Sequence, residues 1–275
     1  MGIKFYRPMT SARRYYSVST FEDITTKTPH KSLLLPKRKR GGRNNLGRLT
    51  AKYRGGGEKQ HLRMVDFKRD KLGIPAKIVS IEYDPNRSAR IDLLSYRDGE
   101  YRYILAPEGL RTGEELMSGR NIAIKIGNAM PIQDIPVGVE IHNLQLYPDY
   151  YSYLVRSAGT SAQILAKEEN HAVIKLPSGE IRKFALNCYA TIGKVSNAEH
   201  KDISIGKAGR SRHRGIRPRT RAVAMNPIDH PMGGGEGKSS GGRHPCSEKG
   251  FIAKGKKTRK HKKHSSKLIM QRRKK

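Results

Sequence analysis

The middle of the chain alternates apolar and polar side chains, and this pattern predicts short β-strands. In residues 76–84, AKIVSIEYD, the side chains of Val79, Ile81 and Tyr83 fall on one face. No window of comparable length has the 3.6-residue periodicity of an amphipathic helix. The other strands that we expect lie at residues 89–96, 101–106, 121–127, 161–167, 171–176, 181–186 and 190–195.

Turn signals separate several of these strands and indicate antiparallel hairpins. Asp98-Gly99 lies between two expected strands, and a two-residue hairpin turn of this kind needs positive φ at both positions. Residues 177–180, PSGE, separate another pair of strands. Antiparallel hairpins at this spacing favour small β-barrels.

The hydrophobic pattern also predicts how the chain divides into domains. A proline-bearing join that includes Pro131 and Pro136 separates two sets of strands, each of ordinary domain size. The flanking segments are rich in Gly, Lys and Arg and hold too few apolar residues to build a core of their own. The expected divisions are 1–60, 61–130, 131–200 and 201–275.

Charge is distributed unevenly over these regions. The 275 residues include 56 Lys or Arg and 24 Asp or Glu, a formal net charge of +32. Residues 58–206 are almost neutral, with 20 basic and 19 acidic side chains. Residues 1–57 hold 14 basic and 2 acidic side chains, and residues 207–275 hold 22 and 3. Two cationic extensions therefore flank a neutral middle, and we expect them to become ordered only against a polyanion.

Nucleic acid is the polyanion that this composition favours. The sequence has no apolar run long enough to span a membrane and no long basic amphipathic helix, which argues against a membrane partner. The first twenty residues lack the apolar core of a secretory signal, so we expect a cytoplasmic protein. The only cysteines are Cys188 and Cys246, too few for a disulfide framework.

Residues 225–245, MNPIDHPMGGGEGKSSGGRHP, hold groups that could suggest catalysis. A phosphate-binding loop needs a glycine, four further residues and then Gly-Lys-Ser, but Met232 occupies the place of that first glycine. His230, His244 and Cys246 do not have the paired spacing of zinc ligands, so we predict no metal site and no cofactor. Asp229 and His230 are adjacent without a candidate nucleophile, and we predict no catalytic residue.

The tripeptide Arg-Ser-Ala occurs in both expected β domains. Arg87 and Ser88 lie in a turn before one strand, together with Arg90, and Arg156 and Ser157 lie before another. A guanidinium held by a rigid turn offers paired donors to phosphate oxygens, and the serine hydroxyl adds another. The repeated tripeptide favours ligand contact over two unrelated surface arginines.

Long segments of the chain together resemble the bacterial-type large-subunit ribosomal protein uL2 (L2) family. The resemblance runs from about Gly41 to the C-terminus, and residues 1–40 match loosely. The segments that carry it include GGRNNLGRLTAKYRGGGEKQHLRMVDFKR (41–69), GIPAKIVSIEYDPNRSARIDLL (73–94), IGNAMPIQDIPVGVEIHN (126–143), RSAGTSAQILAK (156–167) and GKAGRSRHRGIRPRTRAVAMNPIDHPMGGGEG (206–237).

The resemblance implies a mainly β fold, with an OB-like barrel followed by an SH3-like barrel and long basic irregular N- and C-terminal extensions. It implies a structural protein and not an enzyme, one that binds large-subunit rRNA and contacts neighbouring ribosomal proteins. It also implies a place at the small-subunit interface with tRNA nearby, and no homo-oligomer. The family's RNA-contacting arginines correspond to Arg87 and Arg156, and its histidine corresponds to His230.

We extend the expected interface to basic residues of the barrels and both extensions. The expected rRNA-binding residues are Arg87, Ser88, Arg90, Arg156, Ser157, Lys68, Arg69, Arg43, Arg48, Arg54, Arg210, Arg212, Arg214, Arg217, Arg219, Arg221 and Arg243. The loop expected near the peptidyl-transferase centre includes Asn226, Asp229, His230, Gly233, Gly234 and Gly235.

The sequence departs from the family pattern at several places. Met232 replaces a usual histidine, His213 replaces a usual aromatic residue, and the chain contains no tryptophan. Residues 147–155, YPDYYSYLV, replace a glycine-rich approach to Arg156, and these tyrosines either stack on bases or fill the barrel. Two other functions stay open at this stage: catalysis of peptide-bond formation through His230, and general compaction of DNA.

Overall fold

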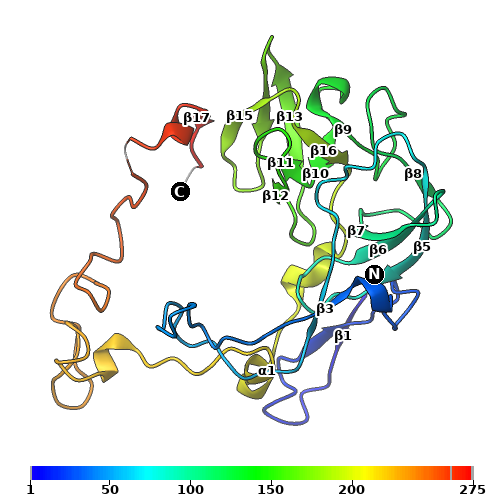
Figure 1. Cartoon of the computed structure of the whole chain (residues 1–275). Helices are drawn as coiled ribbons and strands as arrows, with labels where there is room; N and C mark the ends of the chain where they lie inside the picture. The colour runs from blue at the N-terminus through cyan, green and yellow to red at the C-terminus, as the bar shows by residue number, and fades with distance from the viewer. Residues whose placement is uncertain (1, 261, 274–275) are drawn as a thin grey trace. The chain divides into compact units, whose positions relative to one another are not determined.

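The computed structural model describes residues 2–260 and 262–273, which form two compact units. The first unit consists of Met1–Arg38, Lys59–Lys207 and Lys267–Lys275 and holds all the named strands of the described residues (Figure 1). The second unit consists of Lys39–Glu58 and Ala208–Ser266. The expected mainly β fold, with an OB-like barrel before an SH3-like barrel, is confirmed.

The OB-like part is built on a four-stranded antiparallel sheet with the order β7-β6-β5-β8. Its strands are β5 (Ala76–Glu82), β6 (Ile91–Tyr96), β7 (Tyr101–Leu105) and β8 (Glu115–Leu116). Ile78, Leu94 and Ile104 are almost completely buried between these strands. Burial of each such side chain stabilises the fold by about 1.5–3 kcal/mol.

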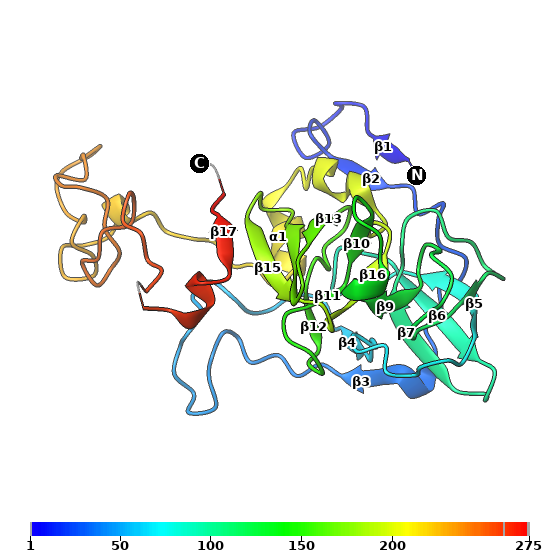
Figure 2. The same ribbon diagram turned by 90° about the horizontal axis from the view of Figure 1, so that it is seen from above.

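The SH3-like part is a seven-stranded antiparallel sheet with the order β17-β15-β14-β13-β10-β16-β9 (Figure 2). Its strands are β9 (Ala129–Pro131), β10 (Glu140–His142), β13 (Ala162–Lys167), β14 (His171–Lys175), β15 (Ile181–Ala185), β16 (Tyr189–Ile192) and β17 (Ile269–Gln271). Its core is separate from that of the first sheet and includes Ile141, Ile164, Ile174 and Phe184. Two separate cores are consistent with two barrels. The expected domain boundaries, 1–60, 61–130, 131–200 and 201–275, stay a prediction.

Short strands and turns complete the first unit. The pairs β1 (Ile3–Phe5) with β2 (Ser17–Ser19), β3 (Leu34–Pro36) with β4 (His61–Arg63), and β11 (Leu144–Gln145) with β12 (Ser152–Leu154) each form a two-stranded sheet. Three single 3-10 turns occur at η1 (Lys31–Leu33), η2 (Ile132–Asp134) and η3 (Ala198–Asp202).

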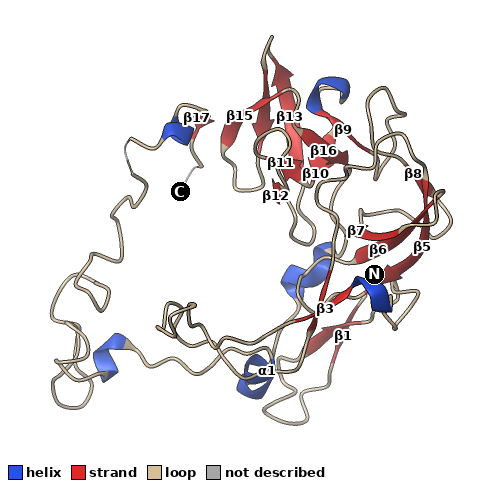
Figure 3. Cartoon of the chain, in the orientation of Figure 1, coloured by secondary structure: helices blue, strands red, loops and turns tan. Residues whose placement is uncertain are grey.

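The second unit is almost entirely loop, as Figure 3 shows. It contains the one-and-a-half-turn helix α1 (Ala208–His213) and the 3-10 turns η4 (Ala222–Ala224) and η5 (His264–Ser266). Two of its segments approach closely: a Cβ on Gly57 would lie 2.7 Å from the backbone nitrogen of Gly215. The glycines there let backbone pack directly against backbone.

The structure differs from three expectations. Residues 121–127 form no strand: the carbonyl of Ala123 accepts from the backbone N–H of Lys125 and from the side-chain amide of Asn128, both close in sequence. Val79, Ile81 and Tyr83 share one face as expected, but it is the outer face: the buried face of β5 carries Ala76 and Ile78, while Val79 is 48% exposed. The predicted irregular C-terminal extension also ends in strand β17, which pairs with β15.

The two hairpins form as expected, with a different turn in the first. Between β6 and β7 only Gly99 has positive φ, at 86°, and Tyr96 N–H bonds the carbonyl of Glu100. This longer turn ends in one left-handed glycine, so Asp98 need not adopt positive φ. Between β14 and β15, Gly179 has a φ of 82° and Leu176 N–H bonds Glu180 in the same way.

Candidate nucleic-acid interface

The two Arg-Ser-Ala segments, distant in the sequence, lie side by side. The backbone N–H of Ala158 donates to the hydroxyl of Ser88 at 3.1 Å. The amide of Asn197 donates to the carbonyl of Ser88 at 2.6 Å. Gly159 has a φ of 65°, and a Cβ there would lie 2.6 Å from Cα of Ala198. The tripeptides are therefore fixed against each other by short polar contacts between the two barrels.

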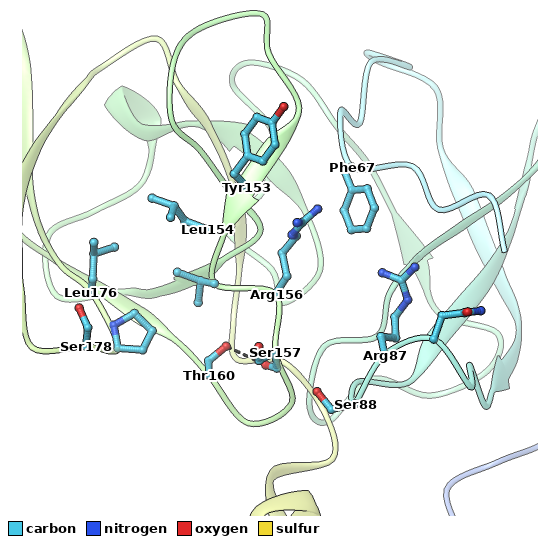
Figure 4. Close-up of a pocket in the computed structure, with 13 residues that line it drawn as sticks. Phe67, Arg87, Ser88, Tyr153, Leu154, Arg156, Ser157, Thr160, Leu176 and Ser178 are labelled. Carbon is cyan, nitrogen blue, oxygen red and sulfur yellow. Dashed lines mark hydrogen bonds between the residues drawn. The ribbon is translucent and has the colours of Figure 1, made fainter. Parts of the chain in front are cut away.

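Arg87 and Arg156 approach the same aromatic ring. The guanidinium of Arg156 lies 4.5 Å from the ring centroid of Phe67, and that of Arg87 lies 5.3 Å from it. Arg156 also lies 5.9 Å from the ring of Tyr153. Tyr153, Arg156, Phe67 and Arg87 thus form a row in which rings and guanidinium groups alternate (Figure 4). Cation–π contacts of this kind hold the guanidinium groups without occupying their N–H donors.

The turn that begins with Asp84 orients Arg87. One carboxylate oxygen of Asp84 accepts from the backbone N–H and the side-chain amide of Asn86, at 2.8 and 2.9 Å. The other accepts from Nε of Arg87 at 2.6 Å. Aspartate commonly bonds its own backbone two residues on, which is why the sequence Asp-Pro-Asn turns here. The Asp84 side chain is fully buried and holds Arg87 through its Nε atom. The two terminal nitrogens of the Arg87 guanidinium, Nη1 and Nη2, remain for a ligand.

The pocket around these arginines has the features of an anion site. It encloses about 740 Å³, within the range of about 300–1,000 Å³ that is usual for ligand pockets. Ser88 and Ser157 line it beside the two arginines, and so does Thr160, which donates its hydroxyl hydrogen to the carbonyl of Ser157 at 2.7 Å. Burial and the nearby charge of Arg87 lower the pKa of Arg156 below its usual value. A bound anion would relieve this repulsion between two like charges.

Arg156 and Arg87 differ in how their charges are balanced. Arg87 is ion-paired with Asp84, whereas Arg156 has no ion pair among residues 2–260 and 262–273. Arg156 therefore carries the uncompensated charge of the pocket. A phosphate group is the ligand that this arrangement of forked donors and hydroxyls fits best.

Arg90 and Arg69 lie in the interior, which differs from their expected contact with rRNA. Arg90 is 2% exposed, pairs with Asp23 at 2.7 Å and lies 4.9 Å from the ring of Phe21. Arg69 is 3% exposed and donates to Ser118 at 3.0 Å. Both guanidinium groups use their donors inside the protein, so we leave them out of the candidate interface.

The other expected basic residues are accessible. Lys68 is exposed beside the pocket, with its ammonium 5.0 Å from the ring of Tyr151. Arg210 of helix α1 is half-buried. The remaining ones, all exposed in the second unit, are Arg43, Arg48, Arg54, Arg212, Arg214, Arg217, Arg219, Arg221 and Arg243.

The glycine-rich loop around His230 packs on itself. His230 is 7% exposed, and its Nδ1 accepts from the backbone N–H of Met232 at 3.0 Å. A Cβ on Gly233 would lie 2.4 Å from the carbonyl oxygen of Met225, so this position needs glycine. Gly234 has positive φ, and Asn226, Asp229 and Gly235 are exposed. The imidazole supports the loop, and the described residues contain no cluster of three or more metal-ligating side chains.

Sequence reasoning missed two contributors to the pocket. Phe67 carried no signal, because an isolated aromatic residue in an irregular segment is indistinguishable from a core residue. Asp84 could have been found from the Asp-Pro-Asn turn that precedes Arg87. For the tyrosine-rich segment the structure excludes one alternative: Tyr147, Tyr150, Tyr151 and Tyr153 are 46–60% exposed and do not fill the barrel.

In the part of the chain that the structure describes, no helix is long and apolar enough to cross a membrane. Comparison with protein families gives two matches. Residues 30–118 match the family described as Ribosomal Proteins L2, RNA binding N-terminal domain. Residues 125–250 match the family described as Ribosomal Proteins L2, C-terminal domain. The pocket takes Phe67 and Arg87 from the first matched region and Tyr153 and Arg156 from the second.

Proposed function

Because the chain belongs to the ribosomal protein L2 family, we propose that it binds large-subunit (23S-type) rRNA through the pocket of Arg87 and Arg156. It acts as a structural constituent of the large subunit and supports subunit assembly and association. The observation that carries this proposal is the pair of guanidinium groups on the ring of Phe67, one of them without an ion pair in the described chain. Two fixed cations beside the hydroxyls of Ser88 and Ser157 match a backbone phosphate of folded RNA.

The cationic extensions supply further basic residues for RNA binding. The accessible arginines of the second unit lie in loops rich in glycine, where backbone and side chains can both reach phosphate. Such contacts recognise the shape and backbone of RNA more than its sequence. Many phosphate contacts also make binding fall steeply with salt.

Binding measurements with the full chain test this proposal against general compaction of DNA. A filter-binding series from low to physiological salt compares a large-subunit rRNA fragment with duplex DNA of equal length. We expect a steep salt dependence for both and clearly tighter binding of the rRNA at physiological salt. Equal affinity for the two would favour DNA compaction and contradict the proposal.

We further propose that the loop around His230 lies near the peptidyl-transferase centre in a structural role, in a ribosome of the cytoplasm. The burial of His230 and its bond to Met232 support this role over the alternative, direct catalysis of peptide-bond formation. The test is a ribosome that carries His230→Gln. We expect near-normal single-turnover peptide transfer in particles that assemble. Normal assembly with transfer slowed by several orders of magnitude would instead support catalysis.

A further inference from the structure

A tyrosine hairpin, defined as residues 144–154, stands beside the pocket. Its base is fixed in the SH3-like barrel: Leu144 is fully buried, and the side chain of Gln145 accepts from the backbone N–H of Tyr189 at 2.9 Å. Ser152 is also buried. Because the base is anchored in the barrel, the backbone that carries the tyrosine side chains has a fixed position beside the pocket.

The hairpin presents aromatic rings to solvent. Tyr150, Tyr151 and Tyr153 are 60%, 54% and 54% exposed. Tyr147 packs edge-to-face against Tyr150, with ring centroids 6.4 Å apart. None of the four hydroxyl groups has a hydrogen-bond partner among the described residues. A cluster of exposed aromatic rings on one hairpin marks an interaction surface more than a solvated loop.

The charges beside the hairpin indicate the partner. Lys68 lies over Tyr151 and Arg156 lies beside Tyr153, so two of the rings have a cation at one face. The acidic groups of the neighbouring second pocket, Asp66, Asp70 and Glu100, are all paired with Arg102. Asp149 is an exposed acid on the hairpin itself, so the positive charge at the rings is local to Lys68 and Arg156. Aromatic rings interleaved with cations are the surface that binds unpaired nucleic acid, with bases on the rings and phosphates on the cations.

We propose that the tyrosine hairpin stacks unpaired rRNA bases next to the phosphate that Arg87 and Arg156 bind. Tyr153 is the first ring of this platform, because it ends the alternating row of rings and guanidinium groups (Figure 4). Tyr150 and Tyr151 extend it toward the tip of the hairpin. The inference rests on the proposed rRNA binding and adds that the segment bound here is single-stranded.

A single-tryptophan reporter tests this directly, because the chain has no tryptophan. The full chain with Tyr153→Trp is titrated with a ten-nucleotide oligoadenylate, and then with a duplex RNA of equal length. Tyr83→Trp is the matched control, since Tyr83 is 47% exposed but lies outside the pocket and the hairpin. We expect oligoadenylate to quench the indole at position 153 strongly and the duplex to quench it much less, with little quenching at position 83. Equal quenching at the two positions, or by the two RNAs, overturns the inference.

Alanine variants give the second measurement. Tyr150→Ala does not touch Arg156, and we expect it to weaken oligoadenylate binding about fivefold or more, with duplex binding changed less than about twofold. Tyr153→Phe keeps the ring and should bind like the wild type, whereas Tyr153→Ala should not. Unchanged binding in every tyrosine variant overturns stacking but leaves rRNA binding intact. If Arg156→Ala weakens RNA binding but the tyrosine variants do not, stacking is overturned in the same way. If neither Arg156→Ala nor any tyrosine variant weakens RNA binding, the pocket itself is refuted as an RNA site.

Discussion

The structure predicts that replacing Arg87 and Arg156 by alanine has different consequences. Arg156 has no ion pair in the described chain, so Arg156→Ala removes a ligand contact and the contacts of the guanidinium with the rings of Phe67 and Tyr153. A hydrogen bond to a charged group contributes about 1.5–3 kcal/mol. We therefore expect rRNA affinity to fall about 10- to 100-fold, because about 1.4 kcal/mol corresponds to a factor of ten.

Arg87→Ala removes the same kind of ligand contact and also a structural partner. It leaves the carboxylate of Asp84 fully buried with only the two donors of Asn86. Breaking a buried ion pair on one side costs about 3–5 kcal/mol, and the two remaining donors to Asp84 place this case at about 3 kcal/mol. We expect both the free energy of unfolding and the rRNA affinity to fall.

The assay combines urea unfolding of the free protein with filter binding at matched salt. Adding Asp84→Asn to Arg87→Ala removes the buried charge, and this double variant should regain much of the stability and none of the affinity. Arg156→Ala loses only its contacts with the two rings, so its free energy of unfolding should fall by about 1 kcal/mol or less. Equal stability of Arg87→Ala and Arg156→Ala would refute the structural role of the Asp84 pair. Unchanged affinity in both would remove the pocket from the RNA interface.

Three further predictions concern stability. Burial raises the pKa of Asp92 well above its usual value of 3.8, so the free energy of unfolding falls as pH rises above that value. Asp92→Asn should therefore raise the free energy of unfolding at pH 7, measured by urea titration. The gain should vanish near pH 3. Burial lowers the pKa of His142 from 6.5 to about 4, so the wild type should lose about 3 kcal/mol of stability as pH falls between those values. If the free energy of unfolding of a His142→Gln variant fell equally with pH, this prediction would be contradicted. Gly159→Ala should destabilise the barrel junction by about 1 kcal/mol or more, since Gly159 has positive φ and its Cβ would meet Ala198; thermal melting of this variant against Gly179→Ala, whose Cβ meets nothing, separates the clash from the φ cost.

The long strands could be predicted from sequence because their alternation spans five or more residues. Strands of two or three residues, such as β8 and β11, are too short to carry a pattern. Residues 121–127 alternate as a strand would, but Ile124 and Ile126 are 54% and 45% exposed, and the carbonyl of Ala123 is bonded locally by Lys125 and Asn128. Alternation alone does not reveal whether a partner strand exists.

The same reasoning explains what could be predicted of the site. The repeated Arg-Ser-Ala marked Arg87 and Arg156, and the structure brings them to one ring. Arg90 looked equivalent in sequence, yet its partner Asp23 is 67 residues away and buries it. An ion pair with a residue distant in the sequence determines whether an arginine stabilises the fold or is available to bind a ligand. Such a pair is not visible in a single sequence.

Sedimentation tests the central claim, that this chain is a structural component of the large subunit held by rRNA. Cell extract containing the tagged chain is fractionated on a sucrose gradient after a high-salt wash, with Arg156→Ala analysed in parallel. The account predicts that the wild-type chain remains with large subunits and that the variant is partly released. Complete recovery of the wild-type chain in the wash, free of large-subunit rRNA, would contradict it.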